Sequence, residues 1–442
     1  MIKKLVEIFR SKEIRERIIF TLGIFLIFKI GTTLVVPGVD PSFIQFQEGD
    51  IFNLMNVLGG GSLLNFSIFA MGIAPYITAS IIIQLLSKMD VLPKLKELSK
   101  QGEKGRKKLN NATRYLALVI GAVQAYGTFL LMQQSGLQSA TGEPFAGNLR
   151  EIGLIEIQIV LALVAGTMFV VWLADRISTK GVGNGVSMII AAGIISTMPF
   201  QFAEAFRSFT SVDGPSGVIV NGFLNYGLYI LAYLLFIVFV VFIEKSIRKV
   251  PLQQSQNSAT TGGNMHHLPI KLNPAGVIPV IFASSFMMAI VTIASMFGVD
   301  NDIAVAATQI FNMSAQYNDV YWGLMIYITL IILFTFFWSN MQLDPNKISE
   351  NLATSNSYIP GIRQGQETER YLTKVINRVS SVGALALASV AASPILLTII
   401  FNLGSEIAFG GTSLIIVVGV SVETYNQIKS KLAGKEYKGI IG

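Results

Sequence analysis

The chain has 442 residues, of which 52% are hydrophobic and only 13% are charged. A soluble protein of this size needs more polar surface than such a composition provides, so an ordinary soluble enzyme or binding domain is excluded and a polytopic membrane protein is predicted. The chain has no cysteine, which excludes disulfide bonds, thiolate catalysis and cysteine metal sites.

Apolar runs long enough to cross about 30 Å of hydrocarbon predict ten transmembrane helices. The first run follows a basic stretch and has no small-residue cleavage site after it, so we expect a retained span and not a signal peptide. Five spans in each half give the second half the opposite orientation, which permits an inverted repeat. We therefore expect an all-α polytopic membrane protein with halves at 1–210 and 211–442. The spans are predicted at about 18–36, 72–88, 115–133, 154–174, 186–203, 217–243, 274–297, 320–339, 375–402 and 412–428.

Basic residues are distributed unevenly between the two sides of these spans. Of the 33 Lys and Arg residues, all except Lys29, Arg150 and Arg207 fall on one side, and the loops on the other side are mainly acidic. Because Lys and Arg accumulate in short cytoplasmic loops, both termini are predicted to be cytoplasmic. The net charge of +7 is then mainly an orientation signal, and contact between the basic loops and ribosomal RNA is the alternative interpretation.

The stretch from 53 to 88 differs from an ordinary span. Three consecutive glycines at 59–61 precede a short apolar piece, and Gly72 with Pro75 interrupts the backbone before a second apolar piece begins. Lipid cannot satisfy the backbone groups that such a break frees, so broken helices survive only where protein or a water-filled cavity surrounds them. The stretch therefore indicates a pathway through the membrane.

Residues that could carry chemistry are sparse. His266 and His267 are adjacent in a polar loop without nearby cysteine or carboxylate partners, a pattern that does not favour a metal site. The glycine-rich run 181–185 lacks the strand and the Lys-Ser/Thr pair of a phosphate-binding loop, so it is interpreted as a tight turn between helices. The predicted spans contain no carboxylate pair and no nucleophile–base pair, and Lys29 alone in its span is expected to snorkel or to pack against a partner. We expect no enzyme activity, no metal and no cofactor.

Branched aliphatic side chains lie at helical spacing beside the breaks. Ile73 and Ile77 are one turn apart after the first break, and Val186 and Ile190 repeat this spacing at the start of the fifth span. Periodicity alone does not distinguish a pore lining from lipid-facing or core packing, so both interpretations stay open on spacing alone.

Seven motifs occur in order along nearly the whole chain. They are FSIFAMGIAPYITAS at 66–80, QGEKGRKK at 101–108, TRY at 113–115, GVGNGVSM at 181–188, LPIKLNPAGVIPVIFA at 268–283, IPGIR at 359–363 and GGTSLIIV at 410–417. With these motifs the chain resembles the SecY family, the channel subunits of the bacterial Sec protein translocon. Several motifs in a fixed order over ten spans are a specific signal.

The resemblance implies a central hourglass pore between two inverted five-helix halves. A short plug helix at about 61–70 would close the outer side, and its glycines would form a hinge. An aliphatic ring would narrow the pore midway, and such a ring has no fixed charge to hold ions. Carried over by position, the ring is Ile73, Ile77, Val186, Ile190, Ile281 and Ile416. The plug and hinge are Gly59, Gly60, Gly61, Ser62, Leu63, Leu64, Asn65, Phe66 and Ser67.

The resemblance also implies a passive protein-conducting channel in the bacterial cell (inner) membrane. Apolar signal sequences would reach membrane lipid through a lateral gate between span two and spans seven and eight, with Thr78, Gln84 and Gln124 as polar gate residues. Ordinary hydrogen bonding between helices is the equally weighted alternative for these three. A SecA ATPase or the ribosome would drive signal-sequence-bearing polypeptides through it, and SecE-like and SecG-like small membrane subunits would be bound.

Two cytoplasmic loops, at about 244–272 and 340–372, resemble the protruding loops that receive the motor or the ribosome. Arg363 matches the loop arginine tied to that partner, with a merely solvated arginine as the alternative. The basic residues Arg106, Lys107 and Lys108 are expected to add to this contact.

Both loops depart from the family pattern. The first is polar and nearly uncharged at 251–264, and the second has Gln364 where a proline is common and a non-basic segment at 351–356. Such departures are typical of a divergent or accessory paralogue with a narrower substrate set or a variant motor.

Two alternative hypotheses, each for another class of protein, predict different sequence features. A ten-span secondary transporter with inverted repeats needs coupled ionisable groups at the midplane. A lipid-facing scaffold that only assembles partners would tolerate polar residues at the ring positions.

Overall fold

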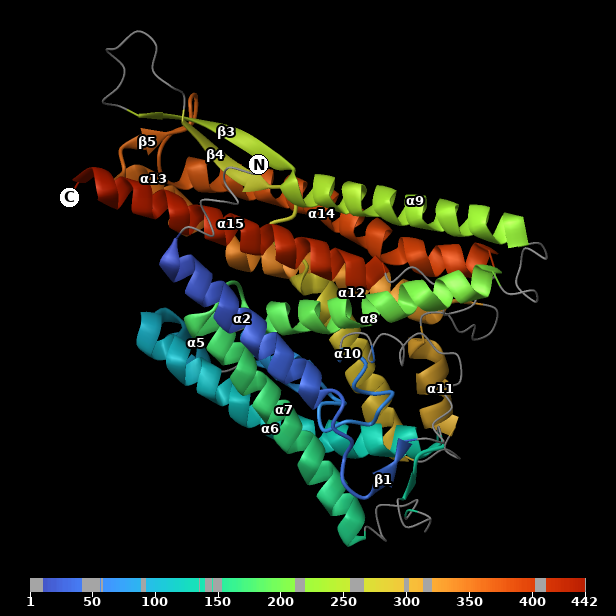
Figure 1. Ribbon diagram of the computed structural model, residues 1–442. Coiled ribbons are helices and arrows are strands. Elements are labelled where there is room, and N and C mark those ends of the chain that lie inside the picture. The colour runs from blue at the N-terminus through green and yellow to red at the C-terminus, as the bar shows by residue number, and fades with distance from the viewer. Residues whose placement is uncertain are drawn as a thin grey trace.

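The computed structural model describes residues 11–41, 56, 59–88, 93–134, 136–139, 145, 153–210, 219–254, 266–297, 302–312, 320–401 and 411–441. Most of this part of the chain is helical (Figure 1), and each of the ten predicted spans has a helix. These helices are α2 (Lys12–Gly31), α4 (Ala74–Lys88), α6 (Gly102–Gln134), α7 (Leu154–Lys180), α8 (Gly185–Thr210), α9 (Ile219–Lys245), α10 (Ile278–Ala294), α12 (Trp322–Gln342), α14 (Gln366–Phe401) and α15 (Gly411–Ile441).

Several helices extend beyond the predicted apolar runs. The helix α6 begins with the charged run Gly102–Lys108, and α14 begins with Gln366 and two glutamates in its first turn. Lys, Arg, Glu and Gln are good helix formers, so a helix continues where its apolar run ends. By length and composition, Gly102–Gln133, Leu154–Lys180, Gly185–Thr210, Gly222–Lys245, Trp322–Thr354 and Gln366–Ser393 can cross a membrane, and Ala74–Ser87 and Ile278–Ala294 are shorter apolar helices.

The two halves of the chain repeat one packing pattern. In the first half α4 packs on α6, α6 on α7 and α7 on α8, while α2 packs on both α7 and α8. In the second half α10 packs on α12, α12 on α14 and α14 on α15, while α9 packs on both α14 and α15. Each helix of the first half thus has the same neighbours as the helix at the corresponding position of the second half. The predicted all-α fold of two five-helix halves is confirmed.

The two halves meet along two seams. On one side α10 of the second half contacts α4 and α6 of the first half; we call this the gate seam. On the other side α8 contacts α9 and α15, and α9 follows α8 directly in the chain. The helix α10 therefore belongs to the second half but also packs against the first.

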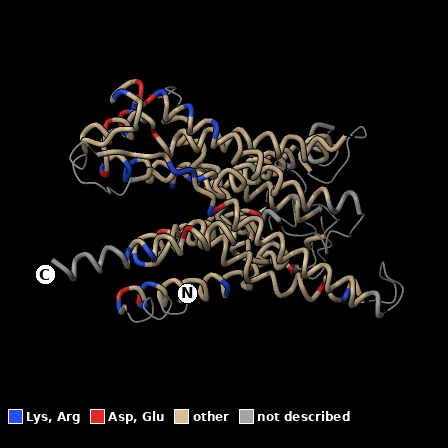
Figure 2. Tube along the Cα trace, turned by 90° about the horizontal axis from the view of Figure 1, so that it is seen from above, with Lys and Arg blue, Asp and Glu red and all other residues tan. Residues whose placement is uncertain are grey.

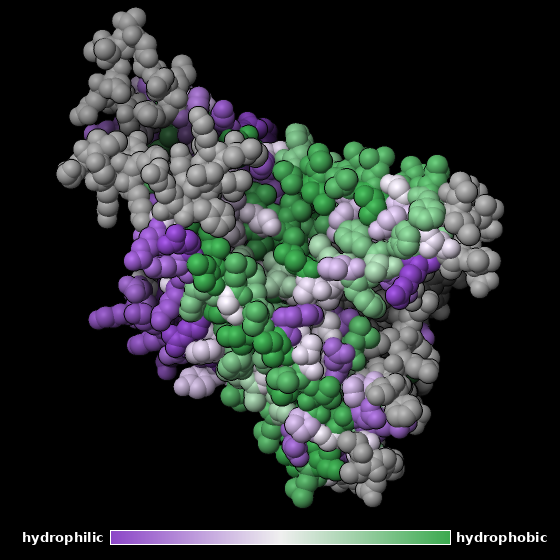
Figure 3. Space-filling view, in the orientation of Figure 1, coloured by the Kyte–Doolittle hydropathy of each residue, from purple (hydrophilic) through white to green (hydrophobic). Residues whose placement is uncertain are grey.

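The outer surface of the helices is apolar. On α9, Leu224, Val238 and Phe242 are each more than 60% exposed, and the face drawn in Figure 3 carries broad hydrophobic areas over the helices. Exposure of such a surface to water has an unfavourable free energy, whereas contact with lipid does not. The helices are therefore suited to a hydrocarbon environment.

Two small sheets join loops at opposite ends of the helices. At one end β1 (Val39–Asp40) pairs antiparallel with β2 (Gln138–Ser139). At the other end β3 (Ile247–Gln254) lies between β4 (His266–Lys271) and β5 (Ser357–Tyr358), and both pairings are antiparallel. Many of the described Lys and Arg residues gather at this second end (Figure 2).

The three-stranded sheet unites two segments that are distant in the chain. Strands β3 and β4 belong to the predicted loop 244–272, and β5 with α13 (Pro345–Thr354) belongs to the predicted loop 340–372. Buried Val250, Ile270, Leu352 and Ile359 pack with the start of α14 in one apolar cluster. The two predicted loops therefore form one unit. The remaining elements are α5 (Pro93–Lys100), η3 (Ser295–Phe297) and α11 (Asp302–Phe311).

Candidate functional site

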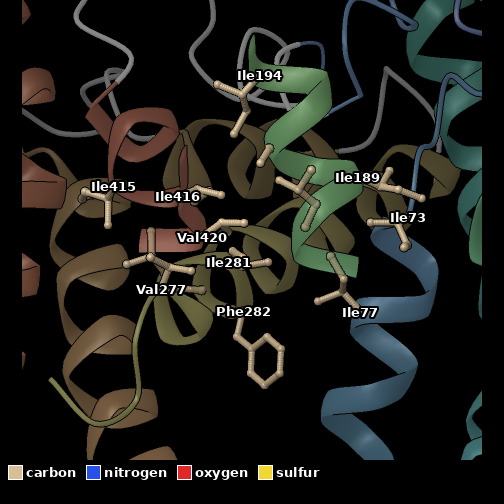
Figure 4. Close-up of a cluster of buried hydrophobic side chains, with 14 of the residues drawn as sticks. Ile73, Ile77, Ile189, Ile194, Val277, Ile281, Phe282, Ile415, Ile416 and Val420 are labelled. Atoms are coloured by element: carbon tan, nitrogen blue, oxygen red, sulfur yellow. The ribbon is translucent and has the colours of Figure 1, made fainter. Parts of the chain in front are cut away.

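The six predicted ring residues come together at the centre of the molecule. They are contributed by four helices of both halves and by Ile73, which directly precedes α4. Val186 is half-buried and the other five are at most 5% exposed. Figure 4 shows Ile73 and Ile77 at the start of the α4 segment, Ile281 from α10 and Ile416 from α15 around one centre, beside α8. The side chains are thus placed as a closed apolar constriction would require.

Further aliphatic residues belong to the same cluster and were not predicted from the sequence. Val277 lies one turn before Ile281, Val420 one turn after Ile416 and Ile194 one turn after Ile190 (Figure 4). Extending the helical spacing by one turn from each ring residue would have identified all three. The buried aliphatic residues therefore extend one turn beyond the predicted ring on α8 and α15 and directly before α10.

We call residues 59–70, which contain the predicted hinge glycines and the plug predicted at 61–70, the plug segment. This segment is not helical. The chain forms turns and one bridge from 59 to 73, with positive φ angles at Gly60, Gly61 and Gly72 and also at Phe66, where φ is 38°. The expected short helix at 61–70 is therefore wrong, because repeated left-handed residues prevent a run of helical hydrogen bonds. Pro75 lies in the first turn of α4, where a missing N–H costs nothing.

Hydrogen bonds tie the plug segment to the chain that follows α2. The Val36 amide donates to the Phe66 carbonyl at 3.1 Å, and the Ile68 amide donates to the Leu34 carbonyl at 2.9 Å. These bonds flank an antiparallel bridge between Val35 and Ser67. The backbone groups that a helix would have paired are satisfied here by strand-like pairing.

The side chains of the plug segment face the gate seam. Ser62, Leu63, Phe66 and Ser67 are fully buried, whereas Leu64 and Asn65 are exposed. Leu63 and Phe66 belong to an apolar cluster that also contains residues of α6, α7 and α10, namely Phe129, Leu163, Met288 and Val291 among others. The segment thus packs against helices from both halves at once.

A glycine on α7 allows the plug segment to pack directly on that helix. A Cβ atom at Gly166 would collide with the backbone carbonyl of Ile68. Because a backbone carbonyl cannot rotate away, we expect Gly166→Ala to displace the segment and to lower the free energy of unfolding by about 1–3 kcal/mol. The prediction is checked by the thermal stability of the purified protein and by ion leak in proteoliposomes. Gly23→Ala on α2 is the control, since no atom lies within 4 Å of its added Cβ, and an equal effect of both variants would contradict the prediction.

Polar side chains line a small cavity at the gate seam. Gln124 and Thr128 of α6 face Ser285 and Thr292 of α10, with Pro75 at the start of α4. Of the predicted gate residues, Gln124 lines this cavity. The other two bond within α4, where Thr78 donates to the Ala74 carbonyl at 3.2 Å and Gln84 donates to Ser80 Oγ at 2.8 Å. The structure therefore brings one of the three to the seam cavity.

The predicted partner-contact residues are exposed at the basic end of the molecule. Arg106, Lys107 and Lys108 lie in the first turns of α6, where Lys107 Nζ is 3.4 Å from Glu103. Arg363 follows β5 in a turn whose Gly361 and Gly365 have positive φ angles, and its side chain is exposed. The tight turn predicted at 181–185 is confirmed, since it joins α7 to α8.

Comparison with known proteins agrees with this architecture. The SecY family profile matches residues 67–425. The chain is 41% identical over 446 residues to the protein translocase subunit SecY of Staphylococcus carnosus, and the match covers 100% of both chains. It is 40% identical to the protein translocase subunit SecY of Streptococcus sanguinis, covering 99% of this chain and 98% of that one. The chain belongs to the SecY family.

Solved structures show the same fold for SecY-family and related chains at low identity. A structure described as a protein-conducting channel matches with a TM-score of 0.64 and 16% identity, covering 94% of this chain and 92% of that one. Sec61 in a canine ribosome–channel complex from the endoplasmic reticulum matches with a TM-score of 0.62 and 16% identity, with the same coverage. As a SecY-family member the chain is a multi-pass membrane protein of a channel family and not an enzyme.

Proposed function

We propose that this chain is the channel through which unfolded secretory polypeptides cross the membrane and from which hydrophobic segments move sideways into lipid. The observation that carries the proposal is that the six aliphatic ring residues, from four helices of both halves and from Ile73, lie within one larger buried apolar cluster, with the plug segment packed beside it. Such a cluster has no charge with which to hold ions, and aliphatic side chains can close around any passing sequence. The channel itself is passive.

Each part of the site takes one role in this proposal. The ring of Ile73, Ile77, Val186, Ile190, Ile281 and Ile416 is the seal, and the plug segment covers it in the resting state. The polar residues of the gate seam, Gln124 among them, adjust the free energy of opening, and Thr78 and Gln84 on α4 add to this effect. A seam held by such contacts suits a gate, since hydrogen bonds between transmembrane helices contribute only about 1 kcal/mol each.

The proposal also assigns the partners and the orientation. The basic end of the molecule, including the β3–β4–β5 sheet, is the cytoplasmic side and receives a SecA ATPase or the ribosome, and both termini lie on this side. SecE-like and SecG-like subunits complete the complex in the bacterial inner membrane. The family relatives from Staphylococcus and Streptococcus support a bacterial setting. The halves at 1–210 and 211–442 move apart when the channel opens.

Reconstitution tests the proposed function directly. The purified complex is placed in proteoliposomes with a SecA motor, ATP and a secretory precursor, and we expect fragments of the precursor to become protected from added protease. A precursor with a charged residue in its signal sequence should stay unprotected. Equal protection of both precursors, or protection of neither, would contradict the proposal.

Arg363 provides a separate test of the partner surface. We expect Arg363→Ala to reduce motor-driven translocation about tenfold or more, because an exposed guanidinium on this loop can pair with a partner carboxylate. Motor affinity and ATP-dependent protection of precursor are measured. Arg207→Ala is the matched control, since Arg207 is also exposed but lies in the last turn of α8, away from the β3–β4–β5 sheet (Figure 1). An undiminished rate for Arg363→Ala would remove Arg363 from the contact.

A further inference from the structure

We propose that Lys29 is the residue that holds the plug segment in its resting position. Lys29 Nζ donates to the Gly60 carbonyl at 3.2 Å and to Ser196 Oγ at 3.3 Å. Gly60 belongs to the predicted plug hinge, and Ser196 lies on α8. One basic side chain thus connects α2, the plug hinge and the helix that carries two of the ring residues. We call this contact of Lys29 with Gly60 and Ser196 the latch. The inference rests on the proposed function, because only a channel with a plug needs such a contact.

The backbone at Gly60 presents its carbonyl through a conformation that only glycine adopts readily. Its φ angle is 72°, and a Cβ atom there would come within 3.0 Å of the Cα atom of Gly193 on α8. The hinge therefore lies against α8 backbone to backbone, with its carbonyl 3.5 Å from Ser196 Oγ. Ser196 also donates to the Gly193 carbonyl at 2.8 Å, which fixes its hydroxyl as an acceptor for Lys29.

Lys29 lies among apolar side chains, so the two acceptors matter for the stability of its charge. Lys29 lies in the last turn of α2, among exposed Leu26, Ile27 and Ile30. A basic side chain in such apolar surroundings needs an acceptor, because an unpaired one is costly at membrane depth. Its acceptors within the described residues come from the hinge and from α8, so the need of Lys29 for a partner favours the closed arrangement.

Displacement of the plug segment would break this contact. The segment is also hydrogen-bonded to Leu34 and Val36, which follow Lys29 in the chain, and to Asn56, which precedes the hinge. The Lys29 contact itself connects the hinge to α2 and α8. Both elements belong to the first half. The latch is therefore not strained when the two halves separate, and it is released only when the plug segment itself moves.

Ion leak in the absence of a precursor is the measurement that isolates the latch. We expect Lys29→Met to raise the resting leak of proteoliposomes about tenfold, equivalent to about 1.4 kcal/mol. Lys29→Arg, which keeps the charge and the donors, should restore the wild-type leak. Lys12→Met at the other end of α2 is the matched control and should leave the leak unchanged.

A double-mutant comparison separates a latch from a merely structural lysine. Ser196→Ala should raise the leak when Lys29 is present and should add nothing to Lys29→Met, since Ser196 acts through its hydrogen bond with the Lys29 ammonium. If Lys29→Met does not accumulate in the membrane, Lys29→Gln is the second variant and should give an intermediate leak.

The outcomes distinguish failure of the latch from failure of the channel. Wild-type leak in both Lys29→Met and Lys29→Gln, with a strong leak in Ile190→Ser, would overturn the latch and leave the channel standing. Equal leak in Lys29→Arg and Lys29→Met would also overturn it. Absence of leak in every variant together with absence of precursor protection would instead overturn the proposed function.

Discussion

Replacing Ile190 with serine is expected to make the resting channel leak ions about tenfold or more, and adding Ile77→Ser and Ile281→Ser to multiply the leak further. Each of the three side chains is at most 5% exposed in the central cluster. Burial of an isoleucine side chain contributes about 1.5–3 kcal/mol to closure, and a serine hydroxyl at the same place attracts water into the constriction. Ion flux across proteoliposomes without precursor is the measurement.

The matched control for the ring lies on the same helix. Ile195 lies on α8, a little more than one turn after Ile190, and its side chain is 50% exposed. Ile195→Ser therefore makes the same chemical change outside the cluster and should leave the seal intact. A lipid-facing scaffold predicts that neither variant leaks, and this result would contradict the seal assigned to Ile190.

Replacing Gly127 with alanine is expected to force the gate seam apart. A Cβ atom at Gly127 would collide with the backbone carbonyl of Thr292, so α6 and α10 approach each other there without a side chain between them. Alanine is favoured over glycine in a helix by up to about 1 kcal/mol, but the clash should cost about 1–3 kcal/mol. The net result should be a lower melting temperature and a channel that accepts precursors with defective signal sequences.

The variant Gly121→Ala on the same helix distinguishes the effect of the steric clash from the effect of the higher helix propensity of alanine. A Cβ atom there would lie 3.7 Å from Pro75 Cβ, which is an ordinary contact. Gly121→Ala should therefore be neutral or slightly stabilising and should keep the requirement for an intact signal sequence. If Gly127→Ala behaves like Gly121→Ala in both assays, then the close approach of α6 and α10 does not control the gate.

The sequence predicted the spans well because hydrocarbon imposes a length and a composition on each helix. It did not predict where the helices end, since charged residues at the start of α6 and α14 continue the helix in water. The pairing of β3 with β5 was also not predicted, because short strands from distant loops carry no sequence signal for their partner.

The candidate site was predicted in position but not in detail. The ring positions came from a family resemblance and gather in one cluster, and helical spacing alone had left packing open as an alternative. The plug was expected to be a helix, but the left-handed φ angles at Gly60, Gly61 and Phe66 favour strand-like pairing with the chain after α2. The contact of Lys29 with Gly60 joins residues 31 positions apart, so only the folded chain reveals it.

The absence of native cysteine makes one measurement decisive for the channel. A single cysteine is placed at Ile190, a secretory protein with its own single cysteine is arrested midway, and disulfide formation is followed in membranes. We predict a crosslink that depends on the signal sequence, because a translocating chain must pass through the ring. Arrested chains that engage the membrane without crosslinking at Ile190, Ile281 or Ile416 would contradict the account.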